Sequence, residues 1–207
     1  MYLRIKRAID IVVGCIGIAV FAPVILVVSV AIRLVMGRPV LFRQLRPGLK
    51  GQPFSCLKFR TMNDKRTETG ELLADANRIT PLGAWLRRTS LDELPQLWNI
   101  LRGELSIIGP RPLLMEYLPY YTDEEHRRHS VRPGLTGWAQ IHGRNHVDFD
   151  ERLKMDVWYV DHLSWRLDLH IVVATIGLVF TATGTDLVSY LPLHEQRRSL
   201  GNKQTID

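Results

Sequence analysis

Cysteine is scarce in this chain. The 207 residues include two, Cys15 inside an apolar stretch and Cys56 beside Leu57. Two cysteines cannot build a disulfide framework or a cysteine-based zinc site, so we expect a reducing compartment. Hydrophobic residues make up 46% and charged residues 23% of the chain, which excludes a disordered, collagen-like or coiled-coil chain as a whole. The length and composition predict one packed domain.

Acidic side chains are rare near the amino terminus. Residues 1–70 contain twelve Lys or Arg against three Asp or Glu, a balance of +9, so the total of +6 leaves −3 for the remainder. This basic segment surrounds the most apolar stretch of the chain. A membrane-tethered protein that binds anionic lipid or nucleic acid would account for this asymmetry, although no nucleic-acid motif accompanies it.

Formal charge is absent from the 22 residues 11–32, roughly 33 Å of helix and long enough to span a bilayer. A cleavable signal peptide has a shorter apolar region and a small-residue cleavage site, so we exclude one. Lys and Arg flank both ends of the stretch, whereas the positive-inside rule expects them on one side of a single span. Pro23 lies near its middle and removes a backbone hydrogen bond. We predict a re-entrant helix-break-helix with both ends in the cytoplasm; a kinked span is the alternative.

The remaining sequence predicts an α+β fold that is mostly helical. Glycine, proline and β-forming residues predict turns and short strands in residues 37–70, and three- and four-residue apolar spacings predict helices in residues 71–105, ending near Gly103. Three further segments follow: a polar helix over 113–130, loop and strand over 131–145, and a charged helix over 148–163. We expect a membrane hairpin in residues 1–38, a catalytic domain in 39–186 and a loosely held polar tail in 187–207.

A second apolar stretch, Leu169–Phe180, is too short to cross a bilayer. Trp158, Tyr159 and Trp165 precede it, and such side chains favour the headgroup region of a membrane. We therefore predict an amphipathic helix lying on the membrane surface. An ordinary buried helix is the alternative.

Two adjacent carboxylates, Asp92 and Glu93, lie within TSLDELPQLWNILRGELSIIGPRP (89–112). Taken alone they fit a capping box with Ser90, in which acids favour the first turn of a helix. Arg87 and Arg88 precede them and Arg111 follows, so cations able to grip a phosphate accompany the acids. Carboxylates beside arginines indicate phosphoryl chemistry, because an ionised aspartate can attack phosphorus without a separate base. Mg²⁺ would neutralise the repulsion between the two anions.

Four sequence blocks together resemble the bacterial monotopic phosphoglycosyl transferases, also called polyprenyl-phosphate sugar transferases. They are the proline-interrupted apolar stretch, KFRTM (58–62), the 89–112 block and RPGLTGWAQIHGRN (132–145). The resemblance covers residues 2–185 or so. It implies transfer of a sugar 1-phosphate from a UDP-sugar to polyprenyl (undecaprenyl) phosphate with release of UMP. It also implies a monotopic enzyme on the cytoplasmic face of the bacterial inner membrane, at the start of glycan assembly such as that of exopolysaccharide or O-antigen.

Carried over position by position, the resemblance implies that Asp92 is the nucleophile and that Glu93 shares metal or proton handling with it. The other implied site residues contact substrate phosphate or the nucleotide sugar: Lys58, Arg60, Arg87, Pro110, Arg111, Pro112 and Arg144. Many members have Ser-Pro at the helix break, whereas this chain has Ala22-Pro23. From the resemblance we expect the chain to be the minimal form of the family, and a homodimer is compatible with it.

Zinc binding and phosphatase activity are two further hypotheses. Four histidines, His126, His129, His142 and His146, have spacings that could suggest zinc, but no pattern such as HExxH accompanies them, and packed or solvated histidines are commoner. A phosphatase of the same shape would use water in place of the lipid phosphate and release inorganic phosphate. The sequence names neither the sugar nor the glycan pathway.

Overall fold

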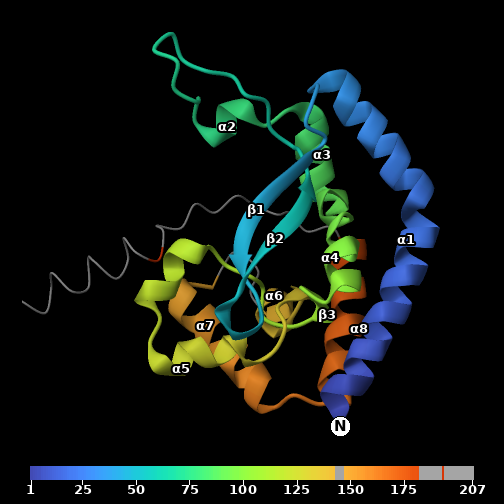
Figure 1. Cartoon of the computed structure of the whole chain (residues 1–207), viewed down its shortest axis with the longest axis vertical. Helices are drawn as coiled ribbons and strands as arrows, with labels where there is room; N and C mark the ends of the chain where they lie inside the picture. Colours follow the sequence, from blue (N-terminus) through green and yellow to red (C-terminus); the bar gives the residue numbers. More distant parts are fainter. Residues whose placement is uncertain (143–146, 182–192, 194–207) are drawn as a thin grey trace, which may run out of the picture.

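The structure, a computed structural model, describes residues 1–142, 147–181 and 193. It opens with one long helix, α1 (Tyr2–Val35), which lies along the whole length of the molecule (Figure 1). Within the part of the chain that the structure describes, α1 is the one helix long and apolar enough to cross a membrane. Most of its apolar side chains are exposed, and a narrow stripe that includes Gly14, Val28 and Ile32 is buried against the rest of the chain.

The predicted break at Pro23 is wrong in its form. Pro23 lies inside an uninterrupted helix, so the structure does not contain two separate arms. Figure 1 shows instead a helix that bends along its length. Proline removes one hydrogen bond to the preceding turn, which bends a helix, and a bend leaves the remaining turns intact.

The amino-terminal end of α1 is held by polar contacts. Lys6 and Tyr2 each donate a hydrogen bond of 2.5 Å to the carboxylate of Asp168, and Asp10 accepts from the hydroxyl of Ser106 and the amide of Ile107. The other end is held by apolar packing of Val28 and Ile32 in a cluster with Phe59 and Leu86. Both ends of α1 therefore contact the domain formed by the later residues.

The predicted strands between residues 37 and 70 are confirmed. β1 (Leu41–Pro47) and β2 (Pro53–Phe59) form an antiparallel hairpin around the turn η1 (Leu49–Gly51), with Leu41 opposite Phe59. α2 (Asp75–Arg78) and α3 (Pro81–Arg88) follow. Gly83 lets α3 lie directly on β2's continuation, since a Cβ there would meet the carbonyl oxygen of Thr61 at 1.9 Å.

A short 3₁₀ turn, η2 (Leu91–Glu93), leads into α4 (Gln96–Arg102), which packs on α1. The contact uses two glycines: a Cβ on Gly14 would lie 2.8 Å from Leu101, and one on Gly17 would lie 3.3 Å from Leu97. α4 ends at Gly103 with a left-handed backbone, as predicted. The glycines bring α4, and with it η2, close to the apolar helix.

Two motifs that are distant in sequence meet in a small parallel sheet, β3 (Ser106–Ile108) with β4 (Gly134–Thr136). Their backbones touch through three glycines. A Cβ on Gly134 would lie 2.1 Å from the amide nitrogen of Gly109, and one on Gly137 would lie 2.1 Å from the Gly109 carbonyl oxygen. The GPRP and RPGLTGW segments therefore form one structural unit.

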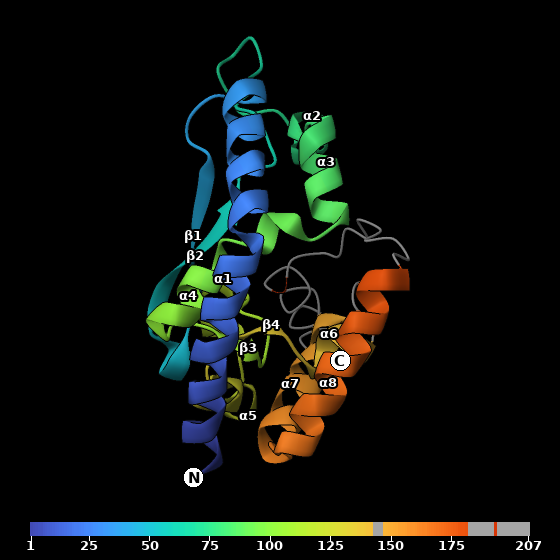
Figure 2. The same cartoon turned by 90° about the vertical axis from the view of Figure 1, so that its right-hand side faces the viewer.

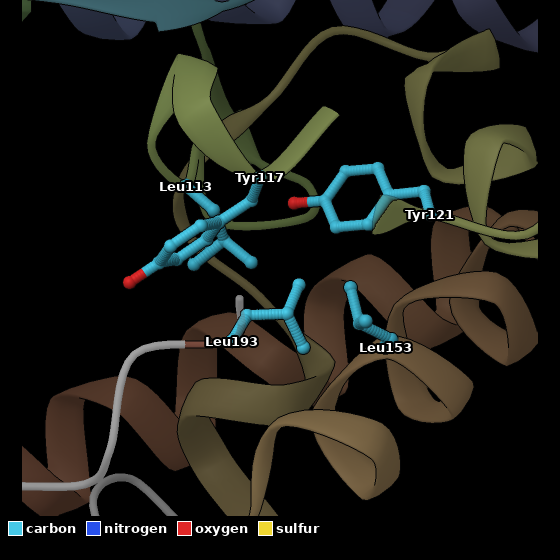
Figure 3. Close-up of a cluster of buried hydrophobic side chains, with 5 residues drawn as sticks. All are labelled: Leu113, Tyr117, Tyr121, Leu153 and Leu193. Atoms are coloured by element: carbon cyan, nitrogen blue, oxygen red, sulfur yellow. The ribbon is translucent and has the colours of Figure 1, made fainter. Parts of the chain in front are cut away.

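The polar helix predicted over 113–130 is wrong. Short turns replace it, because Pro119 interrupts the segment: η3 (Met115–Tyr120), α5 (Asp123–His126) and η4 (Arg127–Ser130). They pack on α7 (Phe149–Asp161), the predicted charged helix, which is confirmed. α6 (Trp138–His142) was predicted as loop and strand. Figure 3 shows the apolar cluster that joins these elements, formed by Leu113, Tyr117, Tyr121, Leu153 and Leu193.

The last described helix, α8 (Trp165–Thr181), contains the second apolar stretch and confirms that it is helical. Its inner face buries Asp168 and Ile171, and its outer face exposes Trp165, Leu169 and Val173 by more than half. The outer face is thus apolar and suited to lipid contact, and the helix is not an ordinary buried one. Apart from Leu193, the tail predicted over 187–207 lies outside the described residues.

Candidate active site

Asp92 and Glu93 both line a large cavity of about 1760 Å³. They sit on η2, immediately before α4. The capping-box alternative is wrong, because the Ser90 side chain makes no capping hydrogen bond and α4 begins later, after Pro95. Ser90 has a left-handed backbone, with φ of 56°, which is uncommon for a residue other than glycine. Strained backbone of this kind gathers at functional sites.

Glu93 is held by two cations. Lys58 Nζ and Arg111 Nη2 each lie 2.6 Å from Glu93 Oε1. Burial alone would raise the pKa of Glu93, but the charges of Arg111 and Lys58 outweigh burial and lower the pKa to about 2. Glu93 is therefore a permanent anion whose position is fixed from β2 and from the GPRP segment.

Asp92 is more weakly paired. Its nearest cation is Lys58, with 3.7 Å between Nζ and Oδ2. Burial and the neighbouring charge of Glu93 raise the pKa of Asp92, while Lys58, Arg111 and Arg87 oppose the rise. A buried carboxylate with one loosely held cation is a poorly solvated, available nucleophile.

Two more of the predicted residues, Arg87 and Arg60, line the same cavity. Arg87, on α3, donates from Nε to the hydroxyl of Thr61 at 3.0 Å and lines the cavity beside Arg88. Arg60 also lines the cavity, but its guanidinium bonds to Asp64 and to the carbonyls of Met36, Arg38 and Met62. Arg60 therefore secures the end of α1.

The two prolines of the GPRP segment act on the backbone. The Pro110 carbonyl accepts from the amide of Gly134 at 3.0 Å, and the Pro112 carbonyl accepts from Arg46 at 3.4 Å. These contacts hold the backbone on each side of Arg111. Arg144 lies outside the described residues, so its predicted role stays a prediction.

Three residues near the site escaped the sequence analysis. Arg46, on β1, lines the cavity. Arg128 and Asp156 form a buried ion pair of 2.6 Å, and Arg128 Nη2 also donates to the carbonyl of Arg111 at 2.7 Å. The pair thus supports the residue that holds Glu93. No motif spacing connects Arg128 with Asp156, and a buried charge in a short polar turn gives no sequence signal.

Asn99, in the block that carries the two acids, links α4 to β2. Its amide nitrogen donates to the carbonyl of Ser55 at 2.8 Å, and its amide oxygen accepts from the amide of Leu57 at 3.0 Å. This contact sets η2 beside Lys58, so the strand and the turn present their charges to one another.

The two carboxylates have the hard oxygen donors that a magnesium ion prefers. Within the described parts of the chain no group of three or more His, Cys, Asp or Glu residues could hold a metal, but Mg²⁺ is commonly bound by one or two carboxylates together with substrate phosphates. Asp92 and Glu93 supply such hard oxygen ligands.

Two carboxylates, the cations Lys58, Arg87 and Arg111, and an adjoining apolar helix are brought together at this site. Such a site suits a membrane-associated enzyme that handles phosphorylated substrates. A family model described as bacterial sugar transferase matches residues 1–182, so the chain belongs to the bacterial sugar transferase family. The resemblance drawn from the sequence blocks is confirmed at this level, and the protein is an enzyme of the sugar phosphotransferase type.

Curated relatives agree with the family. The chain is 46% identical over 187 residues to "Uncharacterized sugar transferase EpsL" of Bacillus subtilis, covering 90% of this chain and 93% of the relative. It is 42% identical over 188 residues to the UDP-glucose:undecaprenyl-phosphate glucose-1-phosphate transferase of Caulobacter vibrioides, covering 85% of this chain and 70% of the relative. The Escherichia coli protein of the same name is 39% identical, and the chain spans 39% of it.

Proposed function

We propose that this enzyme transfers a sugar 1-phosphate from a UDP-sugar to polyprenyl phosphate, with UMP as the second product. The observation that carries the proposal is the placement of Asp92: it is buried and paired only loosely, with Lys58 at 3.7 Å, in a cavity that reaches α1. The names of the Caulobacter and Escherichia coli relatives support the same donor and acceptor classes.

The first step is a displacement at the phosphorus that carries the sugar. An Asp92 carboxylate oxygen attacks this phosphorus, the bond to the bridging oxygen of the diphosphate breaks, and UMP leaves with the electron pair. Arg87 and Lys58 lie where they can bind the phosphate oxygens, and Arg111 keeps Glu93 in place. The product on the enzyme is an aspartyl phosphosugar.

The second step reverses the bond to Asp92. A phosphate oxygen of polyprenyl phosphate attacks the same phosphorus, forms the new diphosphate bond and releases the Asp92 carboxylate. The proposal requires the lipid phosphate to reach η2, and the packing of α4 against Gly14 and Gly17 places η2 next to the apolar helix.

Mg²⁺ is the proposed cofactor, held by Asp92 and Glu93 together with donor phosphates. When bound, it would polarise the phosphate and reduce the repulsion between carboxylate and substrate. Lys58 already lies near both carboxylates, so it shares the task of limiting that repulsion.

We infer that α1 enters the cytoplasmic leaflet of the inner membrane without crossing it. Both ends of α1 contact the same domain, the first through Asp168 and Ser106 and the second through Phe59 and Leu86. A helix that crossed the bilayer would carry one of these contacts to the other side. Labelling of cysteines introduced at positions 2 and 38 tests the inference: both are expected to react only from the cytoplasm, and reaction of either from outside would refute it.

The reaction is tested with purified protein in detergent, supplied with Mg²⁺, polyprenyl phosphate and each of a panel of UDP-sugars. UMP release that needs the lipid and Mg²⁺ is expected with at least one donor. Mass spectrometry of protein incubated with that donor alone should show a phosphosugar adduct on the peptide that contains Asp92. Release of inorganic phosphate without a lipid product would identify the phosphatase instead.

A further inference from the structure

The cavity that holds Asp92 has two chemically different parts. The polar part contains the charged residues described above. The second part, called here the apolar wing, is lined by side chains from α1, α4, the β3–β4 sheet and α8: Phe21, Leu97, Ile107, Leu135, Val172 and Ile176. The two parts adjoin at η2 and α4, where Asp92 and Glu93 are followed by Leu94.

The floor of the apolar wing is hydrophobic surface that the chain leaves partly uncovered. Leu97, Ile107 and Leu135 pack on a buried cluster that includes Ile100 and Leu105, and each remains partly accessible. Partly exposed apolar side chains inside a cavity favour an apolar occupant, because covering them removes hydrocarbon surface from water.

The walls of the apolar wing are the two lipid-suited helices. α1 and α8 begin close together, joined by the contact of Lys6 with Asp168, and then diverge (Figure 2). Phe21 of α1 and Ile176 of α8 line the cavity where the helices have separated. A hydrogen bond of 2.8 Å between the hydroxyls of Thr136 and Thr175 keeps α8 on β4.

Both helices also turn apolar side chains outward. Val20 and Leu26 of α1 are 62% and 65% exposed, and Leu169 and Val173 of α8 are 55% and 62% exposed. Such surfaces belong in hydrocarbon or in the interfacial layer of a membrane. The apolar wing therefore lies between helix faces suited to lipid on its outer side and Asp92 on its inner side.

We propose that the apolar wing binds the isoprenoid units nearest the phosphate of the lipid acceptor. The inference rests on the proposed function and locates its second substrate. The lipid acceptor fits both parts of the cavity. Its phosphate matches the cationic part, and the branched hydrocarbon chain that follows matches the adjoining apolar wing. A UDP-sugar has no comparable apolar portion, so it fits the polar part.

Two adjacent valines of α8 provide a matched test. Val172 lines the apolar wing, whereas Val173 is on the outer face. Val172→Trp should fill the wing and raise the KM for polyprenyl phosphate about tenfold or more, a change equivalent to about 1.4 kcal/mol. Val173→Trp should leave this KM within about twofold, since an outward tryptophan is well accommodated at a membrane interface.

A second variant tests the proposal independently of whether Val172→Trp folds. Ile176→Trp also lies on the cavity, and Ile176 is 51% exposed, so the larger ring does not displace buried core. It should raise the KM for the acceptor as Val172→Trp does, while both variants keep the wild-type KM for the UDP-sugar. An increase in the donor KM of the same size would assign the wing to the donor and overturn the proposal.

The length of the acceptor chain gives a further readout. With methyl phosphate as the acceptor, which has no isoprenoid unit to place in the wing, wild type and Val172→Trp should have the same kcat/KM. A penalty that persists with this acceptor would place the defect at the phosphate site and contradict the proposal. Wild-type protein that forms no lipid product with any donor would instead refute the proposed function, so the two failures are distinguishable.

Discussion

Two clusters of buried charge lie close together in this enzyme and differ in how fully they are satisfied. In the supporting pair, the side chains of Arg128 and Asp156 are 1% and 2% exposed. In the site cluster, those of Lys58 and Arg111 are 28% and 40% exposed. The guanidinium of Arg128 donates hydrogen bonds to Asp156, Tyr121 and the Arg111 carbonyl. The site cluster, in contrast, faces a cavity.

The comparison separates a structural use of charge from a reactive one. A buried ion pair is costly to desolvate and is stable only when its remaining hydrogen bonds are made. The site cluster leaves Asp92 with a single distant cation and a raised pKa, so it retains unsatisfied attraction for a substrate. Substitutions in the two clusters should therefore have different effects on activity and on stability.

The largest effect is expected for Asp92→Asn. Loss of the nucleophile should lower kcat by at least about a thousandfold, measured as UMP release. Because burial and Glu93 raise the pKa of Asp92, the ionised side chain destabilises the folded state near neutral pH. The variant should therefore unfold at the same temperature as wild type or above it. Activity near that of wild type would refute the mechanism.

Breaking the supporting pair should lower stability, in contrast to Asp92→Asn. Arg128→Met leaves Asp156 buried without its cation and should lower the free energy of unfolding by about 3–5 kcal/mol, measured by denaturation in detergent. The double variant Arg128→Met/Asp156→Leu should recover much of that stability. It still lacks the hydrogen bond to Arg111, so its kcat should stay low with the donor KM little changed. Full recovery of kcat would limit the pair to a structural role.

Lys58→Met tests the cation that the two carboxylates share. Lys58 lowers the pKa of Asp92, so its loss raises this pKa further and the reactive anion is lost at a higher pH. The acidic limb of the kcat/KM profile should move to higher pH, and the rate at neutral pH should fall about tenfold. Lys65→Met, at an exposed lysine outside the cavity, is the control. An unmoved limb would show that Lys58 does not act on Asp92.

The smallest effect is expected at Ser90. A β-branched residue is disfavoured at its left-handed backbone, so Ser90→Val should lower stability by about 1–2 kcal/mol. Ser90→Gly should match or exceed wild type in a thermal melt, because glycine adopts this conformation freely. Equal melting temperatures for the valine and glycine variants would contradict strain at this turn.

The elements that local pattern determines were predictable. The hairpin of β1 and β2, the helix α7 and the end of α4 at Gly103 follow from turn residues, apolar spacing and a helix stop. The sequence placed Asp92 and Glu93 among arginines, and the structure brings both acids together with Arg87 and Arg111 in one cavity. Their capping-box interpretation failed because the backbone at Ser90 is left-handed, which no residue pattern reports.

Features that depend on tertiary contact were not predictable. α1 continues through Pro23 as one helix and packs on the rest of the chain before it, at Gly14 and Gly17, and after it, at Val28 and Ile32. The role of Arg60 at the end of α1 and the pairing of Arg128 with Asp156 arise between segments with no common motif. The family resemblance assigned Arg60 to the substrate, because the hydrogen bonds that Arg60 makes to the end of α1 are not visible in the sequence.

The glycine contacts between α1 and α4 have a consequence for engineering the enzyme. Gly14 and Gly17 fix both the rotation and the height of α1 against Leu101 and Leu97. One residue inserted between these glycines and Met1 would turn the preceding segment by about 100° and carry Lys6 away from Asp168. A chimera that takes its membrane helix from a relative must therefore keep the number of residues between these contacts, whatever the side chains that face the lipid.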